Sequence, residues 1–207
     1  MKLFIGFLLA LCLVACTEEP TKVVARPTLV PKDSILSKTD SINPYAPIDV
    51  SPMDMSYFPV NYPIEKMSGK TTAPPVARVI YSRPHRQGRT IFGALVKYGE
   101  PWRLGANEAT EIEFFQSVTI QNRRIPKGKY VLYAIPQQDK WTIVFNTNLN
   151  TWGLRQDEKD DVFRFDVPVQ TATTPIEYYS MVFESESGGA ALVMAWDKVV
   201  ARMSFQF

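Results

Sequence analysis

Residues 178–205 read YYSMVFESESGGAALVMAWDKVVARMSF. Three short apolar segments, at 178–184, 190–196 and 199–205, are separated by Glu-Ser-Gly-Gly and by Asp-Lys. Short runs of β-branched and aromatic residues between turn residues predict strands, and the Gly-Gly pair predicts a hairpin. Helical periodicity is weak throughout this stretch, so it indicates an antiparallel sheet.

The same pattern extends back to residue 76. Further candidate strands lie at 76–83, 110–115, 118–121, 129–135, 141–146 and 162–167. The connections at 121–124 and 136–140 are rich in the Asn, Gln, Pro and Lys of hairpin turns. Eight or nine short strands at about ten-residue spacing predict an all-β fold, an antiparallel β-sandwich or jelly-roll-like domain over residues 50–207.

Composition excludes several classes of protein. The chain has 207 residues, and its 23 Lys and Arg against 21 Asp and Glu leave a net charge of +2, so we expect no nucleic-acid partner. His85 is the only histidine, which excludes every metal site that needs two. The sequence also has no phosphate-binding glycine loop and no nucleophile elbow. We therefore expect no cofactor and no metal.

The first residues resemble an export signal. A positive start is followed by an apolar run at 3–14 that ends in Leu-Val-Ala-Cys, which is similar to a bacterial lipobox. Residues 1–15 therefore predict a lipoprotein signal peptide, with lipidation of Cys16 and attachment to a membrane through that lipid. We expect a cell-envelope protein anchored in the outer membrane, with its periplasmic or surface orientation open. The alternative is an ordinary signal peptide with a chance cysteine.

Residues 16–49 are rich in Pro, Ser and Thr and lack a sustained period, which predicts a disordered, lipidated tether. Asp-Ser-Ile occurs there twice, around Ser34 and Ser41. These triplets resemble an O-glycosylation acceptor used in Bacteroidetes, so the two serines are candidate modification sites. Short motifs also recur by chance in such segments.

Two phrases carry a resemblance to a known family: YSRPHRQGRTIFG at 81–93 and WRLGANEATEIEF at 102–114. They resemble a bacterial exported family, Domain of Unknown Function 2911, and PKGKY at 126–130 and NTWG at 150–153 extend the similarity over residues 50–207. The resemblance implies an all-β, exported domain, often from Bacteroidetes. It implies no activity and no catalytic residue.

The first phrase concentrates positive charge. Within seven positions it holds Arg83, His85, Arg86 and Arg89, beside the loop-forming Pro84 and Gly88. Arginine forks bind carboxylate or phosphate, so this loop could hold a small anionic ligand. The alternative is pairing within the domain, to Glu100, Glu108, Glu111 and Glu113.

Glu108 precedes a predicted strand whose apolar face carries Thr110, Ile112 and Phe114. Alternation places Glu108 on that apolar face, where a buried carboxylate needs a partner. We expect Arg103 or Arg83 in that role, with Asn107 bonding within the turn. The cluster is then either a structural latch or a catalytic site, and a water-accessible hollow beside Glu108 would favour the latter.

Trp152 follows a polar loop and is a candidate for lining a carbohydrate or peptide groove, whereas Trp141 and Trp196 lie within strands and are expected in the core. His85 has arginines as its neighbours and is not expected to be catalytic. The acidic run at 157–161 lacks the spacing of a Ca²⁺ loop and is expected to be solvated surface.

The leading hypothesis is a lipid-anchored binding or envelope-interaction module without enzymatic activity, for a small anionic or carbohydrate ligand and with an unknown protein partner. Its candidate binding residues are Arg83, Arg86, Arg89, Arg103, Asn107, Glu108 and Trp152. The alternative is a periplasmic or surface hydrolase that uses Glu108 with the arginine cluster. A third hypothesis is an assembly component with an exposed apolar edge.

Overall fold

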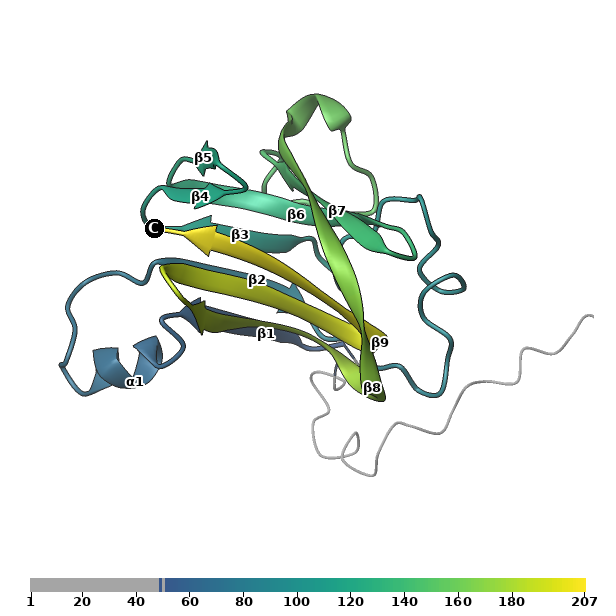
Figure 1. Cartoon of the computed structure of the whole chain (residues 1–207), viewed down its shortest axis with the longest axis horizontal. Helices are drawn as coiled ribbons and strands as arrows, with labels where there is room; N and C mark the ends of the chain where they lie inside the picture. The colour runs from purple at the N-terminus through teal and green to yellow at the C-terminus, as the bar shows by residue number, and fades with distance from the viewer. Residues whose placement is uncertain (1–48, 50) are drawn as a thin grey trace, which may run out of the picture. The chain divides into compact units, whose positions relative to one another are not determined.

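Antiparallel strands dominate the computed structural model, which describes residues 49 and 51–207 (Figure 1). The signal peptide, the lipidation at Cys16 and the modifications at Ser34 and Ser41 concern residues outside this range and stay predictions. The elements are β1 (Met53–Phe58), α1 (Tyr62–Met67), β2 (Ala77–Ser82), β3 (Thr110–Phe114), β4 (Val118–Ile120), β5 (Arg123–Ile125), β6 (Gly128–Pro136), β7 (Lys140–Asn146), the 3-10 helix η2 (Glu158–Asp160), β8 (Asp161–Glu186) and β9 (Gly189–Gln206). No helix among the described residues is long and apolar enough to cross a bilayer.

The strands form one folded antiparallel sheet in the order β1-β2-β3-β6-β7-β8-β9-β4-β5. The sheet folds into the two layers of a sandwich, and β8 belongs to both. Its first part pairs with β7, and its remainder pairs with β9 from Val169 onward. The register of β8 against β9 shifts on both sides of Ile176, where the long strand bends (Figure 1). This arrangement confirms the predicted all-β sandwich.

β9 turns back on itself near Asp197, whose φ of 52° is left-handed (Figure 1). Its two ends meet, since a Cβ built on Gly189 would lie 2.1 Å from the carbonyl oxygen of Phe205. The segments predicted separately at 190–196 and 199–205 are therefore the two arms of one bent strand. Glycine is required at position 189 because no side chain fits against that backbone.

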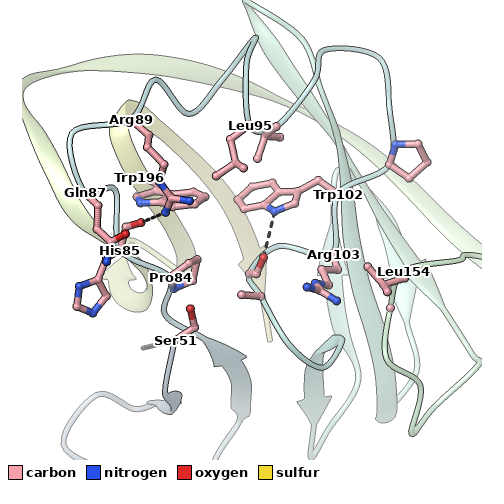
Figure 2. A pocket seen from close by; sticks show the side chains of 15 residues that line it. Ser51, Pro84, His85, Gln87, Arg89, Leu95, Trp102, Arg103, Leu154 and Trp196 are labelled. Atoms are coloured by element: carbon pink, nitrogen blue, oxygen red, sulfur yellow. Dashed lines mark hydrogen bonds between the residues drawn. The ribbon is translucent and has the colours of Figure 1, made fainter. Parts of the chain in front are cut away.

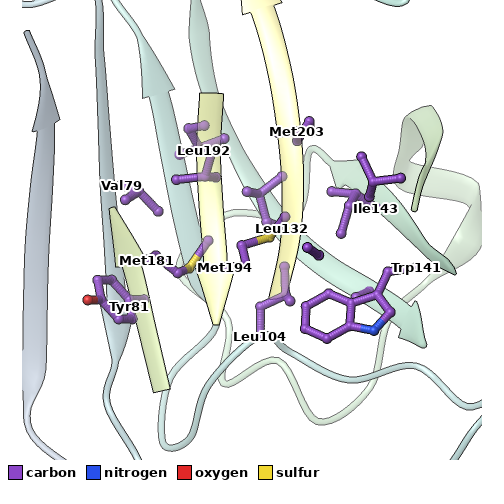
Figure 3. Packing of buried hydrophobic residues seen from close by; sticks show 14 of the residues in the cluster. Val79, Tyr81, Leu104, Leu132, Trp141, Ile143, Met181, Leu192, Met194 and Met203 are labelled. Atoms are coloured by element: carbon purple, nitrogen blue, oxygen red, sulfur yellow. The ribbon is translucent and has the colours of Figure 1, made fainter. Parts of the chain in front are cut away.

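The core lies between the two layers (Figure 3). One layer contributes Val79, Tyr81, Leu132 and Ile143, and the other contributes Met181, Leu192, Met194 and Met203. β3 follows the expected alternation, because every second side chain is buried. Trp141 is fully buried, as predicted, and lies with Leu104 in the same cluster.

The long connection between β2 and β3 is joined to the sandwich by its backbone at two points. The loop after β2 forms an isolated bridge between His85 and Tyr178 of β8. Further along the same connection, Trp102 forms a bridge with Ala134 of β6, through backbone hydrogen bonds of 2.7 and 2.8 Å. These bridges fix the positions of the residues that sequence analysis singled out.

Candidate functional site

A cavity of about 430 Å³ lies between this connection and the sandwich (Figure 2). Its wall combines the loop after β2, the segment around Trp102, the loop before η2 and one residue of β9. The residues that carry its chemistry are His85, Gln87, Arg89, Leu95, Trp102, Arg103, Leu154 and Trp196. Of the described residues that line it, none is acidic.

Trp102 is held rigidly in this wall. Its backbone is bridged to Ala134, and its indole Nε1 donates to the carbonyl oxygen of Gly105 at 3.3 Å. Its ring is nearly parallel to that of Trp196, with centroids 6.0 Å apart, and lies edge-on to Tyr179 at 5.1 Å. Such aromatic contacts fix the plane of the half-buried indole.

The arginines of the loop separate into two groups. Arg83 Nη1 lies 3.0 Å from Asp54 Oδ2, and Arg86 Nε lies 2.7 Å from Asp197 Oδ1, although this second pair is not aligned as a hydrogen bond. Neither Arg83 nor Arg86 lines the cavity. These two cations therefore have counter-ions within the domain and tie the loop to β1 and to the turn of β9.

Arg89 and Arg103 line the cavity and make only backbone contacts. Arg89 donates from Nε to the carbonyl of Arg86 at 2.9 Å and from Nη2 to the carbonyl of His85. Arg103 donates from Nη1 to the carbonyl of Trp152 at 3.2 Å, and partial burial lowers its pKa below the ordinary value. Within the described part of the chain, neither arginine has a carboxylate within 4 Å.

Pairing within the domain, the alternative drawn from the sequence, holds for two of the loop arginines but with other acids. Arg83 and Arg86 pair with Asp54 and Asp197, which belong to distant elements. Of the predicted glutamates, Glu100 lies 3.6 Å from Lys97, Glu113 pairs with Arg78, and Glu108 and Glu111 have no arginine within 4 Å in the described structure. Pairing between distant strands is not visible in sequence spacing.

The prediction that Glu108 is a buried latch is wrong. Glu108 is exposed, and among the described residues its carboxylate has no ion pair. The alternation does not continue beyond β3, because Ala109 and Thr110 are consecutive and both buried, so Glu108 lies off the apolar face. Asn107 instead donates from Nδ2 to Asp49 Oδ2 at 2.9 Å.

Glu108 lines a second hollow, of about 410 Å³, together with Glu111, Met53 and Trp152. The side chain of Trp152 is 54% exposed, whereas its carbonyl holds Arg103 on the side of the cavity. Trp152 is therefore an exposed loop residue, and its role in lining a carbohydrate or peptide groove stays a prediction. A hollow beside Glu108 is the feature expected of a catalytic site, but no arginine among the described residues lines it, and the structure does not bring Glu108 into the cavity of the arginines.

Sequence reasoning missed the importance of Trp102 and of Trp196 for the cavity. Trp196 is buried, as expected, but one edge of it reaches the cavity wall. The signal available for Trp102 was its place in the WRLGANE phrase, directly before Arg103. His85 lines the cavity with its ring packed on Tyr178, at a centroid distance of 4.1 Å.

No group of three or more His, Cys, Asp or Glu residues among those described is placed to hold a metal ion. The acidic run is used structurally: Asp157 caps η2 by accepting from the backbone N–H of Lys159. Asp161 accepts from the hydroxyl of Tyr133 at 2.7 Å and from Arg164 at 2.7 Å.

Comparison with known proteins places the chain in a family without a known activity. No curated protein and no solved structure matches it. One family model matches, over residues 63–205, a range that includes every residue of the cavity wall except Ser51. The chain therefore belongs to the family described as "Protein of unknown function (DUF2911)".

Proposed function

We propose that the cavity binds a small anion and that the protein is a binding module of the cell envelope, without enzymatic activity. The observation that carries this proposal is that Arg89 and Arg103 line one cavity with no acidic neighbour in its wall. Two cations sharing a concave site repel each other and lose part of their hydration. A bound carboxylate or phosphate relieves both costs.

The rigidity of the wall supports this proposal. Trp102 and His85 are bridged by their backbones to β6 and β8. Arg89 is bonded back to its own loop, so its guanidinium is held in one place. A preformed site loses little conformational entropy when its ligand binds.

The hydrolase alternative has weaker support. An enzyme of that kind needs an acid or base beside the groups that hold the substrate. Glu108 lines the other hollow, and no acidic residue among those described lines the arginine cavity. The arrangement favours binding of charge over proton transfer.

The test is a titration of the full chain with acetate and with inorganic phosphate, at constant ionic strength, followed by thermal unfolding. A ligand at a hundred times its Kd adds about 2.7 kcal/mol to the free energy of unfolding, or roughly 5 to 10 °C in Tm. Arg103→Gln should abolish the shift. Arg124→Gln makes the same chemical change at an exposed position of β5, outside the cavity, and should preserve it. An equal shift in both variants would contradict the proposal.

Anchoring at the envelope is the second part of the proposal. Lipid on Cys16 would hold the binding domain at a membrane, with residues 16–49 as the tether. Cys16→Ser should move the protein from the membrane fraction to the soluble fraction after cell lysis. Retention of the variant in the membrane fraction would contradict the anchor.

A further inference from the structure

We propose that the ligand of this cavity is an amphipathic carboxylate, with a ring that lies on Trp102 and a carboxylate that is held by Arg103. This inference rests on the proposed function, because it specifies the anion. Three features of the cavity, as the described residues form it, support this inference: its apolar surface, the free hydrogen-bond donors of Arg103 and its volume.

The apolar part comes from how the indoles are used. Trp102 Nε1 donates to the carbonyl of Gly105, and Trp196 Nε1 donates to the carbonyl of Glu177, both at 3.3 Å. Both indole donors are therefore occupied by the main chain, and the rings offer the cavity only carbon surface. Carbon surface of this kind favours the face or edge of another ring over a polar group.

The mouth of the cavity is apolar as well. Leu95 is 51% exposed and Leu154 is 71% exposed, and both line the cavity (Figure 2). In this view Leu95 lies just above Trp102, and Leu154 lies to its lower right, beyond Arg103. A ligand that covers these side chains gains hydrophobic stabilisation that a bare inorganic anion does not gain.

The anionic part comes from the hydrogen bonds that Arg103 does not make. Its Nη1 is bonded to the carbonyl of Trp152, and its Nε and Nη2 have no hydrogen bond to any described residue. These two N–H groups share one edge of the guanidinium, and that edge binds the two oxygens of a carboxylate bidentately. Arg89 donates from Nε and Nη2 to carbonyls of its own loop, so it can offer the ligand its positive charge and the N–H groups of Nη1.

The size of the cavity agrees with such a ligand. Its volume of about 430 Å³ lies in the lower part of the range found for small-molecule sites, which runs from roughly 300 to 1,000 Å³. Single-ring acids fit this space. Trp102 and Arg103 line the same small cavity, so the charge and the ring of the ligand must be close together.

The experiment compares four probes on the full chain by calorimetric titration: phenylacetate, phenylacetamide, acetate and phenyl phosphate. We expect phenylacetate to bind at least tenfold more tightly than each of the other three. Arg103→Gln should weaken the binding of phenylacetate at least tenfold and leave the binding of phenylacetamide unchanged, whereas Arg124→Gln, outside the cavity on β5, should change neither. Leu154→Ala, at an exposed position, should weaken the binding of phenylacetate severalfold and leave the affinity for acetate unchanged.

The outcomes separate the two proposals. Equal affinity for acetate and phenylacetate overturns the ring assignment and leaves anion binding standing. Tighter binding of phenyl phosphate overturns the carboxylate assignment alone. Equal affinity for phenylacetamide and phenylacetate, or no binding of any probe, overturns both this inference and the proposed function.

Discussion

Tyr179→Phe should make the protein more stable. The ring of Tyr179 is fully buried, edge-on to Trp102 and Tyr81, and its hydroxyl has no hydrogen-bond partner among the described residues. Burial accordingly raises the pKa of Tyr179 well above its ordinary value. An unpaired buried hydroxyl costs about 1–3 kcal/mol, and deleting it loses a few dispersion contacts. We expect a net gain of about 1 kcal/mol, or roughly 2–4 °C in Tm for a domain of this size.

Tyr133→Phe is the matched control. Tyr133 is also buried, but its hydroxyl donates to Asp161 Oδ2 at 2.7 Å. The same change of one oxygen atom there removes a charge-assisted hydrogen bond, which costs about 2 kcal/mol. Urea unfolding followed by tryptophan fluorescence measures both variants against the parent protein. A loss of stability in Tyr179→Phe equal to that of Tyr133→Phe would refute the reasoning, because it would mean that the Tyr179 hydroxyl has a partner.

Three further results are expected. Burial raises the pKa of Tyr81 to about 12, so the unfolded chain loses this proton near pH 10 while the folded chain keeps it. The contribution of Tyr81 to stability should therefore be full below pH 10 and fall towards pH 12. Urea unfolding across that pH range measures this, and a flat profile would contradict it. Glu108→Ala should change the free energy of unfolding by less than about 0.5 kcal/mol, and a loss near 3 kcal/mol would restore the latch. Gly153→Ala should destabilise the protein by about 2 kcal/mol more than Gly88→Ala. Both glycines have a left-handed φ, but only at Gly153 would the new Cβ meet another side chain, that of Ala109 at 2.9 Å. Equal losses of Tm in the two variants would contradict this steric explanation.

Most of the fold could be predicted because buried strands alternate or form apolar runs. The sequence did not show that consecutive strands continue through bends, as in β8 and β9, since the bends interrupt the period. β1 was missed because Met53, Asp54, Met55 and Ser56 include no β-branched or aromatic residue, and its two alternating methionines are exposed. α1 was missed as well, since none of its residues is buried.

The site was predicted only in small part. Of the seven candidate binding residues, Arg89 and Arg103 line the cavity and the other five do not, and Arg103 is not the partner of Glu108 that the sequence suggested. The counter-ions Asp54 and Asp197 come from β1 and β9, and only the folded sheet brings them to the loop. Glu108 was misplaced because alternation was extended beyond Thr110, the first residue of β3, whereas Ala109 and Thr110 are consecutive and both buried, so the period of the strand does not continue to Glu108.

The pairing of the arginines also explains how the cavity keeps its charge. Arg83 and Arg86 fix the loop through Asp54 and Asp197, and both contacts lie outside the cavity. Arg89 satisfies part of its guanidinium on carbonyls of that fixed loop, so it needs no carboxylate to stay in place. If all the cations served only the stability of the loop, acids would be expected beside Arg89 and Arg103 as well. Their absence from the described cavity wall leaves positive charge where a ligand can reach it, and this is the feature on which the binding proposal depends.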